Sequence, residues 1–129
     1  MAARIVRHAE TEDVADDLEH PIPALGVVDV NAIKQDGGAD LHIVIAKPIQ
    51  DDVKSQQRLL TKIESYLGFI GSAEFRAEAG TPNPSNTCVR VQIHPLSSLA
   101  IFELLERCKP WVLENHATLV VSLLDQTIQ

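Results

Sequence analysis

The sequence predicts an α+β fold: an antiparallel sheet in the element order ββαββαβ, with two helices packed on one of its faces. Three observations lead to this prediction. Two stretches, 51–70 and 97–113, carry apolar residues at helical spacing. Five shorter stretches are rich in β-branched residues or alternate apolar with polar residues. A chain of 129 residues also suits one domain, and its last six elements follow the order of a ferredoxin-like βαββαβ unit with an extra N-terminal strand before it.

The chain begins with an acidic stretch that we expect to be a flexible arm. Residues 1–24 contain six acids and two arginines, with few strongly apolar residues. The single α+β domain is therefore predicted to cover residues 25–129. Its first two strands, 26–33 and 41–45, flank Asp36-Gly37-Gly38, a sequence typical of a tight turn, so we predict a hairpin.

The first helix is predicted over residues 51–70. Asp51 and Asp52 are favourable residues for a helix N-terminus, and Gly71 follows the last apolar position. Most aromatic residues of the chain, Tyr66 among them, fall at helical spacing on the apolar sides of the two helices. We interpret them as core residues rather than as part of a ligand site.

Three further elements complete the chain. Residues 73–79 alternate weakly and are interpreted as a short strand, whereas 87–94 alternate cleanly and predict a strand with one buried side. The second helix begins at one of two consecutive serines, and Pro110 either kinks it or begins a fresh turn. Residues 117–124 form the last predicted strand.

The order of strands within the sheet stays open. The short turn of the hairpin requires the first strand to lie beside the second. In a ferredoxin-like sheet that position belongs to the last strand, so the extra strand does not fit the unit simply.

Residues 59–74 carry the pattern Leu-x-x-Lys-Ile-x-x-Tyr-Leu-x-Phe-Ile-x-Ser-x-Glu, and Val27-Val28-Asp29 precede it at the first strand. With these features the chain resembles, over about residues 25–125, an uncharacterised family of small bacterial proteins classed as a domain of unknown function. It departs from that family at 46–50, where members carry more acids. The resemblance implies this order of elements, and it implies no reaction, cofactor or catalytic residue.

Charge and composition exclude several classes of partner. Eleven basic and eighteen acidic residues give a net charge of −7, and the basic residues do not cluster, so we expect no nucleic-acid partner. No apolar run approaches the length that spans a bilayer, so we expect no membrane partner. The first residues show no export signal, which predicts a cytoplasmic protein in which Cys88 and Cys108 are free thiols.

The motifs predict neither a cofactor nor a metal site. Cys88, His94, Cys108 and His116 are scattered along the chain, without the close pairs that zinc ligands form. Neither a P-loop nor a G-x-G-x-x-G sequence occurs. A thiol–imidazole pair of Cys88 with His94 is excluded on one regular strand, because six strand residues span about 20 Å.

The polar face of the predicted sheet is the candidate site. Chemistry and binding need polar groups that converge, and the side of the sheet that the helices leave open is where several strands present them. The residues that we expect to contact a ligand or partner there are Asp29, His42, Arg76, Arg90 and Gln92.

The leading hypothesis is a small non-enzymatic interaction module. Its partner on the open sheet face would be an unknown protein or a second copy of the chain, forming a homodimer. The alternative is a small-molecule enzyme or ligand-binding protein with His42 as base, Arg90 as anion clamp and Asp29 as orienting residue. A deep pocket around His42 and Arg90 would favour the alternative, and a flat face would favour the module.

Overall fold

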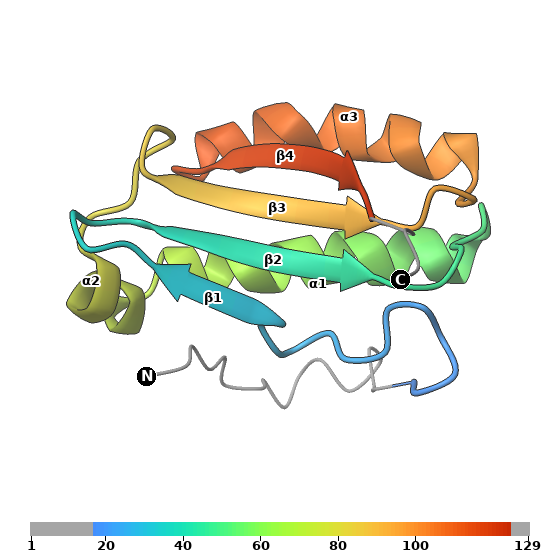
Figure 1. Ribbon diagram of the computed structural model, residues 1–129, viewed down its shortest axis with the longest axis horizontal. Coiled ribbons are helices and arrows are strands. Elements are labelled where there is room, and N and C mark those ends of the chain that lie inside the picture. The colour runs from blue at the N-terminus through green and yellow to red at the C-terminus, as the bar shows by residue number, and fades with distance from the viewer. Residues whose placement is uncertain (1–16, 125–129) are drawn as a thin grey trace, which may run out of the picture.

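The computed structural model describes residues 17–124, which form a four-stranded sheet with helices on one side (Figure 1). The strands are β1 (Val30–Ile33), β2 (Ala39–Ile45), β3 (Thr87–Ile93) and β4 (Thr118–Leu123), and the helices are α1 (Val53–Ile70), α2 (Ala73–Ala79) and α3 (Leu99–Glu114). The strands lie side by side in the order β1-β2-β3-β4. The predicted α+β class is confirmed.

The prediction of an antiparallel sheet is wrong, because the sheet is mixed. β1 pairs with β2 antiparallel, whereas β2 with β3 and β3 with β4 are parallel. The chain crosses back through α1 and α2 between β2 and β3, and through α3 between β3 and β4, so that each strand starts from the same end of the sheet. Both crossovers move in the same direction across the sheet. Because such connections share one hand, α1 and α3 lie on the same side of it (Figure 1). The elements therefore follow neither the predicted ββαββαβ order nor a ferredoxin-like unit.

Residues 73–79, which we predict as a short strand, form the helix α2 instead. The buried residues of α2 are Phe75 and Ala79, and their four-residue spacing fits one face of a helix as well as one side of a strand. Ser72 favours the helix, because its hydroxyl accepts a hydrogen bond from the Phe75 amide at 3.1 Å. The Phe75 ring then packs edge-on against Phe69 of α1, with 5.5 Å between the ring centroids.

One face of the sheet is buried against the helices, as predicted. Along β2 and β3 the residues on that face are at most 1% exposed: Leu41, Ile43, Ile45, Val89, Val91 and Ile93. Most of the residues between them are partly or fully exposed on the opposite face. Tyr66, which we predict as a core residue, is fully buried on α1. The core therefore lies between one face of the sheet and the helix layer.

The two long helices lie close to their predicted positions. α1 begins at Val53, after Asp52, whose carboxylate accepts a hydrogen bond from the Ser55 amide at 2.7 Å. Hydrogen bonds from Ser55 also hold the pKa of the Asp52 carboxyl below its usual value. α3 continues through Pro110 as one helix, so this proline does not begin a fresh turn.

The predicted hairpin is confirmed, and its turn is attached to the end of α2. Ile33 pairs with Ala39 across the turn, and Gly38 has a φ of +84°, which favours glycine. The Gly38 amide donates a hydrogen bond of 2.7 Å to the Ala79 carbonyl. A Cβ atom on Gly38 would lie only 2.0 Å from the Asn86 carbonyl oxygen, so the close packing at this turn requires glycine.

Candidate functional site

The open face of the sheet arranges side chains from three strands in rows. In the strand register, Arg90 of β3 lies between His42 of β2 and Val120 of β4. The two neighbouring rows are Asp40, Cys88 and Thr118, and Val44, Gln92 and Ser122. Paired strands lie about 4.8 Å apart, so side chains within a row are neighbours. Within residues 17–124 no helix or strand packs on this face (Figure 1).

Asp40 is the acidic centre of the open face. Its Oδ2 atom lies 3.5 Å from Nε of Arg90, and its Oδ1 atom lies 3.6 Å from Nζ of Lys34. These distances exceed those of close charge-assisted hydrogen bonds, which are about 2.8 Å. All three side chains are at least a quarter exposed, so the ion pairs contribute little to folding stability.

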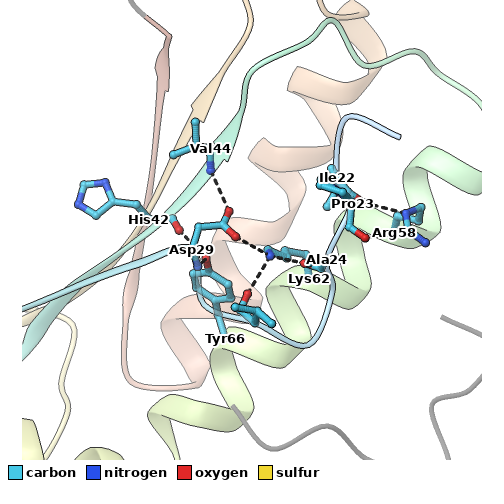
Figure 2. A network of polar contacts seen from close by, with 10 residues as sticks. Ile22, Pro23, Ala24, Asp29, His42, Val44, Arg58, Lys62 and Tyr66 are labelled. Atoms are coloured by element: carbon cyan, nitrogen blue, oxygen red, sulfur yellow. Dashed lines mark hydrogen bonds and ion pairs between the residues drawn. The ribbon is translucent and has the colours of Figure 1, made fainter. Parts of the chain in front are cut away.

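The structure brings three of the five predicted site residues together. His42, Arg90 and Gln92 share the open face, each partly exposed. Arg76 is not on this face, because it belongs to the exposed side of α2 rather than to a strand. Asp29 precedes β1, and Figure 2 shows the His42 ring pointing away from it. The predicted combination of His42 as base, Arg90 as clamp and Asp29 as orienting residue is therefore not assembled.

Asp29 belongs instead to a polar network centred on Lys62 of α1 (Figure 2). The Lys62 side chain is 2% exposed. Its Nζ donates hydrogen bonds to Asp29 Oδ1 and to the Val27 carbonyl, both at 2.8 Å, and to the Ala24 carbonyl. An ammonium group has three donors, and here all three have acceptors. This saturated lysine has a structural role, because no donor is left for a substrate.

Tyr66 extends the same network to the edge of β2. Its hydroxyl accepts a hydrogen bond of 2.7 Å from the Asp29 amide and donates one to the His42 carbonyl. The Val44 amide donates to Asp29 Oδ2 at 3.2 Å. The last pair between β1 and β2 is Val30 with His42. Beyond it, the Tyr66 and Asp29 side chains supply hydrogen-bond partners for the backbone carbonyl of His42 and the backbone amide of Val44. Burial, followed by the nearby Asp29 charge, raises the pKa of Tyr66, which keeps its hydroxyl a donor.

Residues 17–29, which we call the strap, run along α1 and are fastened to it by polar side chains. Arg58 donates to the Ile22 carbonyl at 2.9 Å and to the Pro23 carbonyl at 3.0 Å. Ile22 and Leu25 are 2% and 1% exposed, so they belong to the core. The predicted arm covers residues 1–24. Of these, 1–16 lie outside the described residues, and 17–24 pack against α1 as part of the strap.

The sequence contains a signal for the strap that the prediction of a flexible arm overlooked. Ser55, Arg58, Lys62 and Tyr66 follow one another at three- and four-residue spacing, which places them on one stripe of α1. All four are buried, and all four bond to the strap. A polar stripe at helical spacing within an apolar helix face thus indicates that another segment of the chain packs along the helix there.

His20 of the strap is held in its neutral form by its hydrogen bonds. Its Nδ1 accepts a bond from the Ile22 amide at 2.9 Å, so that nitrogen carries no proton, and Nε2 lies 2.9 Å from Ser55 Oγ. Desolvation by burial, and then the charge of Arg58, lower the pKa of His20 below 6.5, whereas Asp17 opposes them. Protonation would replace the Nδ1 acceptor with a donor and break the bond to Ile22.

We expect the strap to make folding stability depend on pH. Because the folded-state pKa of His20 lies below its unfolded value, the unfolded chain binds more protons as the pH falls through about 6.5. The contribution of His20 is complete above that pH and is lost progressively below it. Urea unfolding at pH 7.5 and pH 5.5 measures the loss, and His20→Gln, which cannot titrate, should lose less. Equal losses in the native chain and in the variant would contradict this role.

The described residues offer few groups for nucleophilic or metal chemistry. Cys88 and Cys108 are free and buried, and burial raises the pKa of both thiols, which disfavours the reactive thiolate. From residue 17 to 124, no three metal-binding side chains gather in one place. In the same range no helix has both the length and the apolar character to cross a bilayer.

The comparisons with known proteins add no relative. No family model, no curated protein and no solved structure matches this chain. The resemblance of residues 59–74 to an uncharacterised bacterial family therefore stays a prediction, and function must be argued from the geometry.

Proposed function

We propose that this protein is a small, cytoplasmic, non-enzymatic interaction module that binds another protein on its open sheet face. One observation carries the proposal: α1 and α3 cover one face of the sheet, and no described helix or strand covers the other. The open face mixes apolar Val44 and Val120 with Arg90 and Gln92. Protein interfaces combine apolar residues with arginine and neutral polar groups in this way.

The enzyme alternative has weaker support. Two of the most buried polar side chains, Lys62 and Tyr66, have their hydrogen bonds satisfied within the fold. Catalytic groups need neighbours that lock their geometry. Among the described residues His42 has no side-chain hydrogen bond, and Arg90 has only its 3.5 Å contact with Asp40. The face therefore favours contact with a surface over chemistry on a small molecule.

Site-specific photo-crosslinking tests the proposed binding face. A photoreactive amino acid replaces Gln92 on the open face, and the protein is irradiated in the cells that produce it. We expect a discrete crosslinked product that contains a second polypeptide. The product should disappear when Arg90→Asp is added, because the charge at the centre of the face is then reversed.

Gln57 provides the matched control. It is also a glutamine and is exposed on α1, away from the open face. A photoreactive residue there should give no such product. Equal crosslinking from positions 57 and 92, or no polypeptide captured from position 92, would contradict the proposal.

A further inference from the structure

The open face is nearly balanced in charge, although the whole chain is acidic. The net charge of −7 makes two copies repel one another over most of their surface. The three rows of the open face contain one acid, Asp40, and one permanent cation, Arg90, beside His42, and the Lys34 ammonium reaches Asp40 from the end of β1. Repulsion between two copies is therefore smallest when their open faces meet.

Asp40 and Arg90 are also only loosely paired within one chain. Their closest atoms are 3.5 Å apart, and the Arg90 side chain is 43% exposed. Neither side chain makes a hydrogen bond of ordinary length to any residue from 17 to 124. A guanidinium has five N–H donors, so Arg90 keeps donors free for a second carboxylate.

We propose that the occupant of the open face is a second copy of this chain, packed face to face so that Arg90 of each copy pairs with Asp40 of the other. This inference rests on the proposed function and names the partner. A two-fold axis that lies in the interface, midway between Arg90 and Asp40, places Arg90 of each copy over Asp40 of the other. Such an isologous contact forms two symmetry-related Arg90–Asp40 ion pairs between the copies. It also encloses Val44, which is 36% exposed in one chain.

The size of the face sets the strength of this dimer. The strands β2, β3 and β4 lie about 4.8 Å apart and are six or seven residues long, so they give a face of about 15 by 20 Å. This area is small compared with the roughly 800 Å² per partner of a typical stable interface. The dimer is therefore weak, with a dissociation constant in the micromolar range or above.

Light scattering coupled to size exclusion tests the dimer on the full chain. We expect the mass of one chain, 14.1 kDa, at low micromolar concentration and a rise toward twice that mass at several hundred micromolar. Arg90→Asp and Asp40→Arg should each stay monomeric, because like charges then meet across the two-fold axis. An equimolar mixture of the two variants should recover the dimer, since the two aspartates of one variant then face the two arginines of the other.

Recovery in the mixture would also show that both variants fold. Arg76→Asp is the matched control, because it makes the same charge reversal on α2, off the face, and it should dimerise like the native chain. A native chain that stays monomeric, single variants that still dimerise, or a mixture that stays monomeric would each overturn the inference. Crosslinking from position 92 to a different polypeptide, with a monomeric native chain, would leave the proposed function intact and remove only the second copy.

Discussion

Lys62→Met is expected to lower the free energy of unfolding by about 3 kcal/mol. Methionine preserves the length and apolar volume of the side chain but removes the charge and all three donors. The Ala24 and Val27 carbonyls and the Asp29 carboxylate then lose their donor where water has little access. Because Asp29 is 30% exposed and can be partly hydrated, the expected loss lies at the lower end of the range for broken buried ion pairs.

Lys109→Met provides the control for the effect of charge alone. Lys109 pairs with Glu106 on the surface of α3 at 3.0 Å, and both side chains are well exposed. Such a pair contributes at most about 0.5 kcal/mol. Urea unfolding of both variants measures the difference. If Lys62→Met were as stable as Lys109→Met, the strap would not depend on the buried ammonium group.

Gly38→Ala is the second substitution with a large expected effect. The new Cβ would lie 2.0 Å from the Asn86 carbonyl oxygen, and the φ of +84° is unfavourable for alanine. The hairpin turn must then move away from β3 and break the bond from the Gly38 amide to Ala79. We expect a loss of about 3 kcal/mol or more, combining backbone strain with a displaced hydrogen bond.

Two other glycines separate these causes. Gly80 has a similar φ of +82°, but a Cβ there meets nothing within 4 Å, so Gly80→Ala should cost only the strain of about 1–3 kcal/mol. Gly68 lies inside α1 with open space beside it, so Gly68→Ala should stabilise by about 0.5–1 kcal/mol. From the highest unfolding midpoint to the lowest, the expected order is Gly68→Ala, the native chain, Gly80→Ala and Gly38→Ala. A Gly38→Ala variant as stable as Gly80→Ala would contradict the clash with Asn86.

Periodicity made the long elements of this fold predictable. The spacing of Leu59, Ile63 and Ile70 identifies α1, and the alternation of Val89, Val91 and Ile93 identifies a strand with one buried side. Both signals are strong because burial repeats over several turns or pleats. Strand direction has no such signal in a single strand, since parallel and antiparallel strands alternate in the same way.

The prediction of a strand at residues 73–79 was wrong, and it led to the wrong strand directions in the predicted sheet. A strand there would have been joined to the strand at 87–94 by a short loop, which favours an antiparallel pair. Because α2 is a helix, α1 and α2 together form a crossover from β2 to β3, and the pairing becomes parallel. Seven residues with two buried positions are too few for periodicity to separate the two structures. The cap at Ser72 was the more specific signal.

The candidate site was only partly predictable for the same reason. Residues on β2 and β3, such as His42 and Arg90, were placed correctly on the open face by alternation. Arg76 was misplaced with its element. Asp29 was misplaced because its bonds to Lys62 and to the Val44 amide depend on how the strap crosses α1, which no local pattern near Asp29 encodes.

The two faces of the sheet can be told apart in solution by adding a soluble gadolinium chelate to protein with labelled valine methyls, because the chelate attenuates the signals of methyls that face solvent. In dilute protein we predict strong signal loss for Val44 and Val120 and none for Val89 and Val91, which are fully buried. In concentrated protein the loss at Val44 and Val120 should diminish as the second copy covers them. Strong attenuation of Val89 and Val91, with Val44 and Val120 protected in dilute solution, would contradict the assignment of the open face.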